Sequence, residues 1–201
     1  MLIQLLSSNP LAFVILAAIF VLALTVHEFA HAFLADRFGD PTPRLAGRVT
    51  LNPLAHLDPL GTLLLFFANF GWAKPVPIDS RHFSRPILDE IQVALAGPFA
   101  NLCLAVVTGI FLRVIPVGPT VVQAAIFIVV LNLNLMIFNL LPIPPLDGSH
   151  FLKILLGEEV YWRLAQIGPF LLLGVIIIGA RPLSALLGNL IYPLAHLIIG
   201  N

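Results

Sequence analysis

The stretch Leu11–Ala35 limits what this chain can fold into more than any other part of the sequence. It is apolar apart from Thr25 until it reaches His27, Glu28 and His31. A helix of about 20 apolar residues crosses the hydrocarbon core of a bilayer, so this stretch predicts a membrane-spanning helix. Ionisable side chains at one end of such a helix are costly there, and they therefore indicate a functional site.

The composition agrees with a membrane protein. Hydrophobic residues make up 59% of the 201 residues and charged residues only 10%, whereas about 25% charged is usual for a soluble domain. Ten basic residues balance ten acidic ones, so a nucleic-acid partner has no electrostatic support. The sequence predicts an integral membrane protein that contacts the lipid bilayer and no nucleic acid.

Four further apolar runs are long enough to span a membrane: Asp89–Ile115, Thr120–Leu141, Tyr161–Ala180 and Pro182–Gly200. We therefore expect an all-α polytopic membrane protein with about five spanning helices. We expect one membrane-embedded domain over residues 1–201, with a core at 11–155 and two C-terminal helices in 156–201.

The connector between the first and second spans carries two weaker signals. The apolar run Leu60–Trp72 is short for a span, which favours a re-entrant or interfacial segment. Alternation in Arg44–Leu51 predicts a short strand or hairpin. We accordingly expect a short re-entrant/β-hairpin segment between the first two spans.

The basic residues predict the topology. If Leu60–Trp72 does not cross the membrane, all basic residues but Arg113 and Arg181 share one side. Such a bias marks the cytoplasmic side. The same arrangement places Asp147 on the side of the histidines. We therefore expect an external N-terminus and an active site that faces the cytoplasm.

His27 and His31 have the spacing of a metal-binding pair. Residues four apart lie on one face of a helix, so two imidazoles can bind one Zn²⁺, with Glu28 beside them as a base. Catalytic zinc usually has three protein ligands. Among the acidic residues, only Glu28 and Asp147 lie in long uncharged surroundings, which narrows the search for the third ligand. The other acidic residues lie in polar connectors or at span edges: Asp36, Asp40, Asp58, Asp79, Asp89, Glu90, Glu158 and Glu159.

Asp147 follows a proline-rich segment at the end of the third span. The three prolines in Pro142–Pro145 cannot continue a helix, so the backbone here is expected to be extended. Extended backbone at membrane depth requires protein or a wet cavity around it, which directs Asp147 into the interior. Gly148 permits a sharp turn or a close approach. Alternatively, Asp147 caps a helix that begins near Ser149.

Three motifs together resemble the site-2 protease family of intramembrane zinc metalloproteases, peptidase family M50. The run His27–His31 (HEFAH) matches the family's HExxH, and Asn139–Gly148 (NLLPIPPLDG) matches its NxxPxPxLDG. Gly97–Asn101 (GPFAN) matches a GPxxN element on the span between them. The chain resembles a minimal form of the family, because it has neither a PDZ-like insertion nor a CBS tail.

The resemblance implies an activity and a set of site residues. One zinc ion per chain would be held by His27, His31 and Asp147, with Glu28 as general base. The substrate would be a transmembrane helix of another protein in a bacterial or archaeal cell membrane. An anti-sigma factor, a signal-peptide remnant or another membrane regulator would fit, and the sequence predicts no oligomeric state.

Two asparagines are candidates for contacts with the substrate. Asn139 or Asn101 could donate a hydrogen bond to the developing oxyanion or to the substrate backbone. Asn101 could instead bond only a neighbouring helix. A further hypothesis is that the re-entrant segment or the Arg44–Leu51 strand pairs with unwound substrate by β-addition.

Other function classes remain open from the residues alone. The histidines and Asp147 could form the site of a non-catalytic metal-binding membrane protein or of a metal transporter. A transporter predicts further ligands along a path through the bilayer, and the span interiors offer none. The remaining histidines lack ligand spacing and are set aside: His56, His82, His150 and His196.

Overall fold

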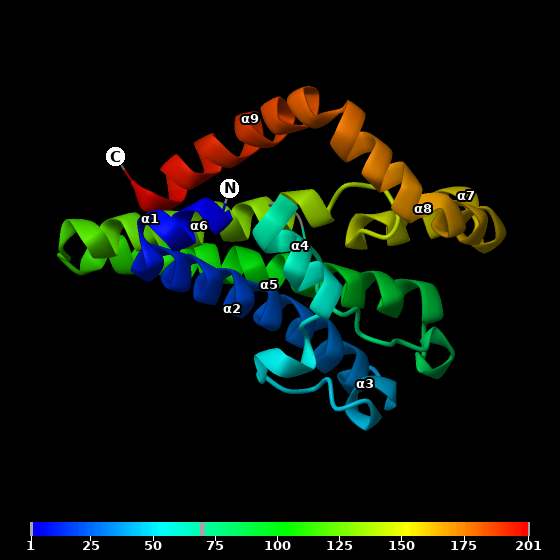
Figure 1. The fold of residues 1–201 in the computed structure, drawn as a ribbon. Helices are drawn as coiled ribbons and strands as arrows, with labels where there is room; N and C mark the ends of the chain where they lie inside the picture. The colour runs from blue at the N-terminus through cyan, green and yellow to red at the C-terminus, as the bar shows by residue number, and fades with distance from the viewer. Residues whose placement is uncertain (1, 69–70, 201) are drawn as a thin grey trace.

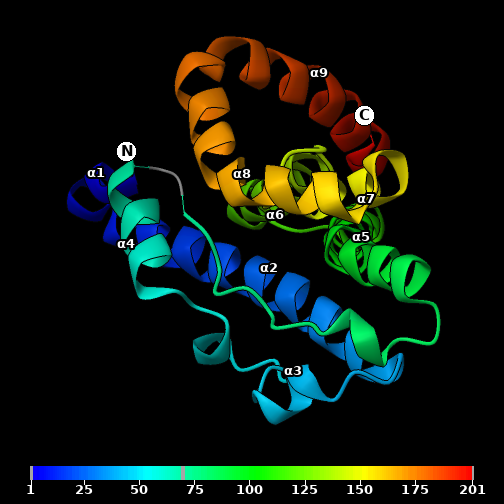
Figure 2. The ribbon, with the colours of Figure 1, turned by 90° about the vertical axis from the view of Figure 1, so that its right-hand side faces the viewer.

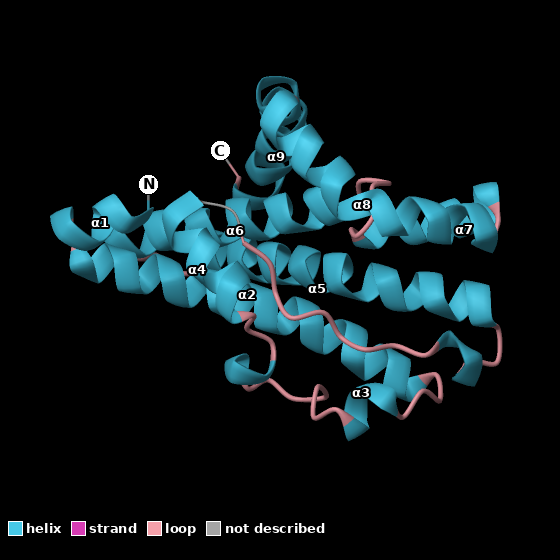
Figure 3. Ribbon diagram, turned by 45° about the vertical axis from the view of Figure 1, so that its right-hand side comes forward, coloured by secondary structure: helices cyan, strands magenta, loops and turns pink. Residues whose placement is uncertain are grey.

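The computed structural model describes residues 2–68 and 71–200, and this part of the chain is helical without any β-strand (Figure 3). The α-helices are α1 (Leu2–Ser8), α2 (Pro10–Arg37), α3 (Thr42–Leu45), α4 (Pro59–Ala68), α5 (Pro86–Val114), α6 (Pro119–Asn139), α7 (Phe151–Leu156), α8 (Glu158–Ile178) and α9 (Ala180–Ile199). Three short 3₁₀ helices join them: η1 (Pro53–Ala55), η2 (Ser80–His82) and η3 (Asp147–His150).

Five helices are long and apolar enough to cross a membrane: α2, α5, α6, α8 and α9. The expectation of an all-helical, multi-pass membrane protein with about five spans is therefore confirmed. Each observed helix differs from its predicted range by a few residues at most. Proline occupies the first position of α2, α5 and α6, where its missing N–H and fixed φ are favourable.

The helix α5 lies between α2 and α6 and packs against both (Figure 1). The helices α8 and α9 form an arch on the far side of α6, and α9 returns to pack on α5 and α6 (Figure 2). A cluster of buried residues packs together where α9 meets α5 and α6: Ala105, Val129, Leu133, Ile137, Ile191 and Ala195. The buried residues of α2 all lie from Ala23 onward, towards the end that carries the histidines.

The prediction of a strand over Arg44–Leu51 is wrong. The helix α3 occupies its start, and Gly47 then reverses the chain with φ +68°. The Arg48 backbone N–H donates to the Pro43 carbonyl at 2.8 Å, which closes the turn. Proline and glycine fix this local turn, and their backbone preferences outweigh the weak alternation of side chains. Within residues 2–68 and 71–200, β-pairing is limited to one antiparallel bridge between Leu57 and Ala73.

The apolar run Leu60–Trp72 folds back on itself, although its residues 69 and 70 lie outside the described part. The helix α4 covers its first part, and α4 contacts α1. A Cβ atom built on Gly61 would lie 2.3 Å from the Trp72 carbonyl oxygen, so the two ends of the run touch. Leu57 and Ala73 are bridged just outside it. The two ends of this run therefore lie next to each other, as expected of a re-entrant segment.

Candidate metal centre

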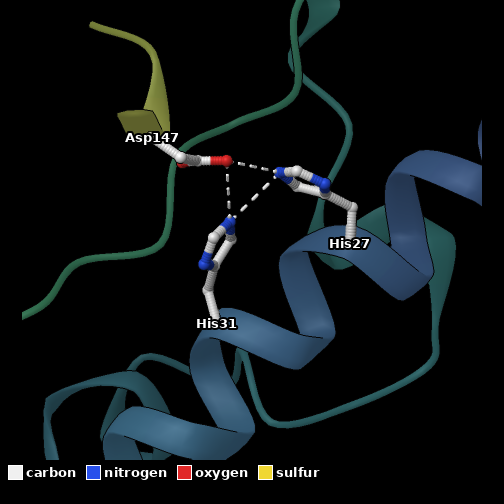
Figure 4. A group of neighbouring side chains, drawn as sticks. All are labelled: His27, His31 and Asp147. Atoms are coloured by element: carbon white, nitrogen blue, oxygen red, sulfur yellow. Dashed lines mark hydrogen bonds and ion pairs between the residues drawn. The ribbon is translucent and has the colours of Figure 1, made fainter. Parts of the chain in front are cut away.

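His27, His31 and Asp147 converge on one point (Figure 4). The two histidine Nε2 atoms are 3.1 Å apart. Asp147 Oδ2 lies 3.1 Å from Nε2 of His27 and 3.5 Å from Nε2 of His31. The histidines come from the buried face of α2, whereas Asp147 opens η3, more than a hundred residues later in the chain. The tertiary fold thus brings together the three residues expected as ligands.

The other ring nitrogen of each histidine is held by α5. Nδ1 of His27 donates to Oδ1 of Asn101 at 2.6 Å, and Nδ1 of His31 donates to the Val93 carbonyl at 2.7 Å. The Asn101 amide nitrogen in turn donates to Oδ1 of Asn132 at 2.8 Å, which fixes the orientation of the amide. Because both Nδ1 atoms carry a proton, each neutral imidazole directs the lone pair of Nε2 towards the point of convergence.

This arrangement fits a zinc ion. Two Nε2 lone pairs and a carboxylate oxygen repel one another unless a cation lies among them. Oδ2 of Asp147 is buried and has no hydrogen-bond partner, as expected of an atom that is completed by a metal. Ligands about 2.0–2.1 Å from zinc in a tetrahedron lie about 3.3–3.4 Å apart, close to the separations of 3.1–3.5 Å observed. Two imidazoles and one carboxylate are also a usual donor set for catalytic zinc.

The proline-rich segment before Asp147 is irregular from Leu140 to Leu146. Leu146 is buried, which places the end of this segment inside the protein, as the sequence predicted. Gly148 makes the close approach that was expected, because a Cβ atom there would lie 2.2 Å from the Leu140 carbonyl oxygen. Asp147 therefore reaches the histidines on a tightly folded loop.

Gly97 brings α5 against the histidines. A Cβ atom at this position would lie 2.3 Å from Nε2 of His31 and 2.6 Å from Nε2 of His27. These distances are far below van der Waals contact, so no larger residue fits without displacement of both imidazoles. Pro98 and Asn101 are also buried on α5. The GPxxN element thus forms the wall behind the metal centre.

A cavity of about 720 Å³ opens on the site. Glu28, the histidines and Asp147 line it, together with residues of the segment 71–81 between α4 and α5 and apolar residues of α2 and α6. Within residues 2–68 and 71–200, the Glu28 carboxylate has no hydrogen bond or ion pair, so it is able to accept a proton. Glu28 therefore lies beside the three expected ligands on the wall of one cavity.

The two candidate asparagines are placed differently. Asn139 lines the cavity, and its amide nitrogen donates to the Leu135 carbonyl at 2.9 Å. Asn101 is fully buried behind His27 and is not among the lining residues. Its amide faces His27 and the neighbouring helices rather than the cavity.

Sequence reasoning missed two parts of this site. Val93 contributes only a backbone carbonyl, which no side-chain pattern reveals. Glu90 and His150 were set aside because of their position and spacing, yet they are joined by a hydrogen bond on the cavity wall, with His150 Nδ1 2.9 Å from Glu90 Oε1. Glu90 precedes Gly97 of the GPxxN element by seven residues, which places both on one face of α5, and this helical spacing was an available signal.

Comparison with known proteins finds relatives that are named zinc metalloproteases. The sequence profile of peptidase family M50 matches residues 117–175. "Putative zinc metalloprotease YwhC" of Bacillus subtilis is 39% identical over 175 residues, which cover 82% of this chain and 80% of the relative. "Putative zinc metalloprotease Rip2" of Mycobacterium tuberculosis is 34% identical over 184 residues, 87% of this chain and 71% of the relative. Stage IV sporulation protein FB of Bacillus subtilis is 26% identical over 146 residues, 73% of this chain and 42% of the relative. No solved structure matches the chain.

Proposed function

The chain belongs to peptidase family M50, the intramembrane zinc metalloproteases of the site-2 protease type, and from this premise we propose that His27, His31 and Asp147 hold its zinc. The observation that carries the proposal is the convergence of two Nε2 lone pairs on a buried carboxylate oxygen without a hydrogen-bond partner. These three side chains can together hold one ion, in agreement with the expected one zinc per chain. The ligands and Glu28 all come from residues 27–147, which supports 11–155 as the catalytic core of one domain.

Glu28 is the general base in this proposal. Zinc in such a site supplies a Lewis acid that polarises a carbonyl and makes water acidic enough to attack at neutral pH. Glu28 follows His27 directly on α2 and lines the cavity, so its carboxylate can take a proton from the attacking water and pass it to the leaving amine. Its lack of a competing ion pair within the described structure supports this role.

The two asparagines have separate roles. Asn139 lies on the cavity wall, and its amide is the candidate donor to the substrate backbone or to the developing oxyanion. Asn101 holds Nδ1 of His27 and so fixes the tautomer and the orientation of that ligand. An orienting role for Asn101 accounts for its complete burial.

The substrate proposed is a transmembrane helix of another protein, cut where it enters the cavity. The cavity has apolar residues of α2 and α6 on one part of its wall and charged residues of η2 and α7 on another. It would suit a locally unwound segment that passes from an apolar to a polar environment. An anti-sigma factor, a signal-peptide remnant or another membrane regulator would meet this description. Pairing of such a segment with the chain by β-addition stays a prediction.

The same reasoning gives a membrane topology. We propose that Leu60–Trp72 enters and leaves on one side, because its ends touch at Gly61 and Trp72. The basic residues other than Arg113 and Arg181 then share the side of the metal centre, which assigns this side to the cytoplasm and the N-terminus to the exterior. A bacterial or archaeal cell membrane is the proposed setting, and the relatives named above come from bacteria.

No observation favours a metal transporter. In the described part of the chain, His27, His31 and Asp147 are the one group of three or more histidine, cysteine or acidic residues able to hold a metal ion. A transport path would need further ligands along the spans.

The zinc content of the detergent-purified protein tests the proposal without knowledge of the substrate. Wild type and Glu28→Gln should each contain about one zinc per chain, whereas Asp147→Ala should retain much less. Only wild type should cut a panel of transmembrane peptides. Full zinc retention in Asp147→Ala would remove the third ligand, and peptide cleavage by Glu28→Gln at the wild-type rate would remove the base.

A further inference from the structure

A second group of ionisable residues lies beside the metal centre. Glu90 of α5 binds both His150 at the end of η3 and Lys153 of α7 through the same carboxylate oxygen, Oε1. The distance from His150 Nδ1 is 2.9 Å, and the Lys153 ammonium group makes a close ion pair. These three residues line the cavity but are not expected to bind the metal. We call them the Glu90 clamp.

The charged groups of Glu90 and Lys153 are largely buried, and neighbouring groups compensate their charges. Only 3% of the Lys153 side chain and 12% of the Glu90 side chain are exposed. The Lys153 Nζ atom also lies 4.9 Å from the ring centroids of both Tyr161 and Trp162 on α8. A buried ammonium group is costly unless a carboxylate or aromatic faces surround it. Lys153 is therefore held in place by α5 on one side and by α8 on the other.

The clamp acts on the short element that presents Asp147. The 3₁₀ helix η3 begins at Asp147 and ends at His150, and α7 follows directly. Before it, residues 140–146 are irregular and cannot fix Asp147 through a regular helical hydrogen-bond ladder. Isolated turn bonds hold the loop itself, such as the Leu146 N–H donating to the Ile143 carbonyl at 2.9 Å. Contacts with other elements must therefore set the position of the loop relative to α2.

The helix α5 supplies such a contact for each of the three ligands. Asn101 holds His27, Val93 holds His31, and Glu90 holds the end of η3. Glu90, Val93, Gly97 and Asn101 recur at three- and four-residue intervals and so share one face of α5. One helix face thus sets the relative positions of groups that are far apart in the sequence.

We propose that Glu90 is a positioning residue of the metal centre, which binds His150 and Lys153 and thereby places Asp147 against the two histidines. The inference rests on the proposed zinc site. Glu90 does not touch the reacting atoms and acts through η3 and α7. Its loss should therefore weaken metal binding and loosen the Asp147 loop while the histidines keep their partners on α5.

The main test replaces the clamp by apolar residues, in the double variant Glu90→Leu with Lys153→Met. Removal of both charges avoids an unpaired buried ion, which would itself destabilise the fold. Zinc affinity is measured by chelator competition in the detergent-purified protein. It should fall about tenfold, as is typical when a residue that supports a metal ligand is lost. Glu90→Gln with Lys153→Met also avoids the unpaired ion but keeps an acceptor for His150, and its zinc affinity should fall less.

A second measurement reports on the loop without metal. Leu146 is 7% exposed, so Leu146→Cys should react slowly with a maleimide in a Cys103→Ser background. The reaction should become severalfold faster in metal-free protein when the clamp is replaced. Because zinc is absent, this rate tests the clamp even if the wild-type chain were found to bind no zinc, a result that would refute the proposed metal site instead.

The matched control is Glu159→Gln with Arg163→Gln, which removes both charges of the exposed Glu159–Arg163 pair on α8 and, like the main test, leaves the net charge unchanged. It should leave both zinc affinity and labelling rate at the level of its parent protein. An unchanged labelling rate in the Glu90→Leu and Lys153→Met variant would overturn the proposal. So would an unchanged zinc affinity in that variant.

Discussion

The histidine side and the aspartate side of the metal centre are built in opposite ways. His27 and His31 lie one turn apart on α2, a continuous helix of 28 residues whose backbone hydrogen bonds already fix their separation. Asp147 follows an irregular loop with three prolines and is placed by contacts with α5 and α8. Ligands on a regular helix thus need contacts with other elements only to fix the orientation of their side chains. The loop needs such contacts for its position as well.

The largest effect is expected from Gly97→Ala, which places a methyl group against both histidine ligands. The added Cβ atom would lie 2.3 Å from His31 Nε2 and 2.6 Å from His27 Nε2. Zinc should be lost from the purified protein, and peptide cleavage should fall by at least about a hundredfold, because both ligands must move. Gly174→Ala is the matched control, since a Cβ there meets no atom within 4 Å. Normal zinc content in Gly97→Ala would show that α5 can move away from α2.

Asn101→Ala tests orientation alone on the histidine side. It removes the acceptor for His27 Nδ1 and the donor to Oδ1 of Asn132, while the Asn132 amide nitrogen still donates to the Ile128 carbonyl. Zinc affinity should fall about 10- to 100-fold, as measured by chelator competition. Asn134→Ala, at an exposed position on α6, should bind zinc like wild type. Loss of cleavage with unchanged zinc affinity would instead support the alternative role of Asn101 as a donor to the substrate.

Gly168→Ala tests the position of the aspartate loop from the α8 side. A Cβ atom at Gly168 would lie 2.6 Å from Cβ of Pro144 and 2.7 Å from its carbonyl oxygen. The loop or α8 must shift, so zinc affinity should fall severalfold, less than for Asn101→Ala. Gly174→Ala on the same helix again serves as the control. Equal zinc affinities for the two variants would mean that contact with α8 does not position the loop.

The smallest effect is expected from Arg163→Gln, which breaks the exposed pair between Glu159 and Arg163 on α8. An exposed pair of this spacing contributes about 0.3–0.5 kcal/mol at most. Neither the zinc content nor the thermal unfolding midpoint should change measurably. A clear loss of zinc in this variant would show that charge on α8 affects the centre without any contact to the clamp.

Part of the site could be predicted because its signals are local. The four-residue spacing of His27 and His31 places them on one face of any helix, and the prolines before Asp147 exclude a helix in any fold. Glu28 and Asp147 stood out because long uncharged stretches surround them. The failed strand at Arg44–Leu51 was also local, but there Pro43 and Gly47 carried the stronger preference.

The amino-acid sequence by itself determined the number of spans, the membrane setting and the identity of the proposed ligands. These follow from hydrophobic length and from short motifs, whose physics acts between neighbouring residues. Only the tertiary structure decided that Asn101 faces His27, that the Val93 carbonyl holds His31 and that Glu90 binds the element carrying Asp147. Each of these contacts joins residues about 60 or more positions apart. They depend on how α5 packs between α2 and α6, which no local pattern specifies.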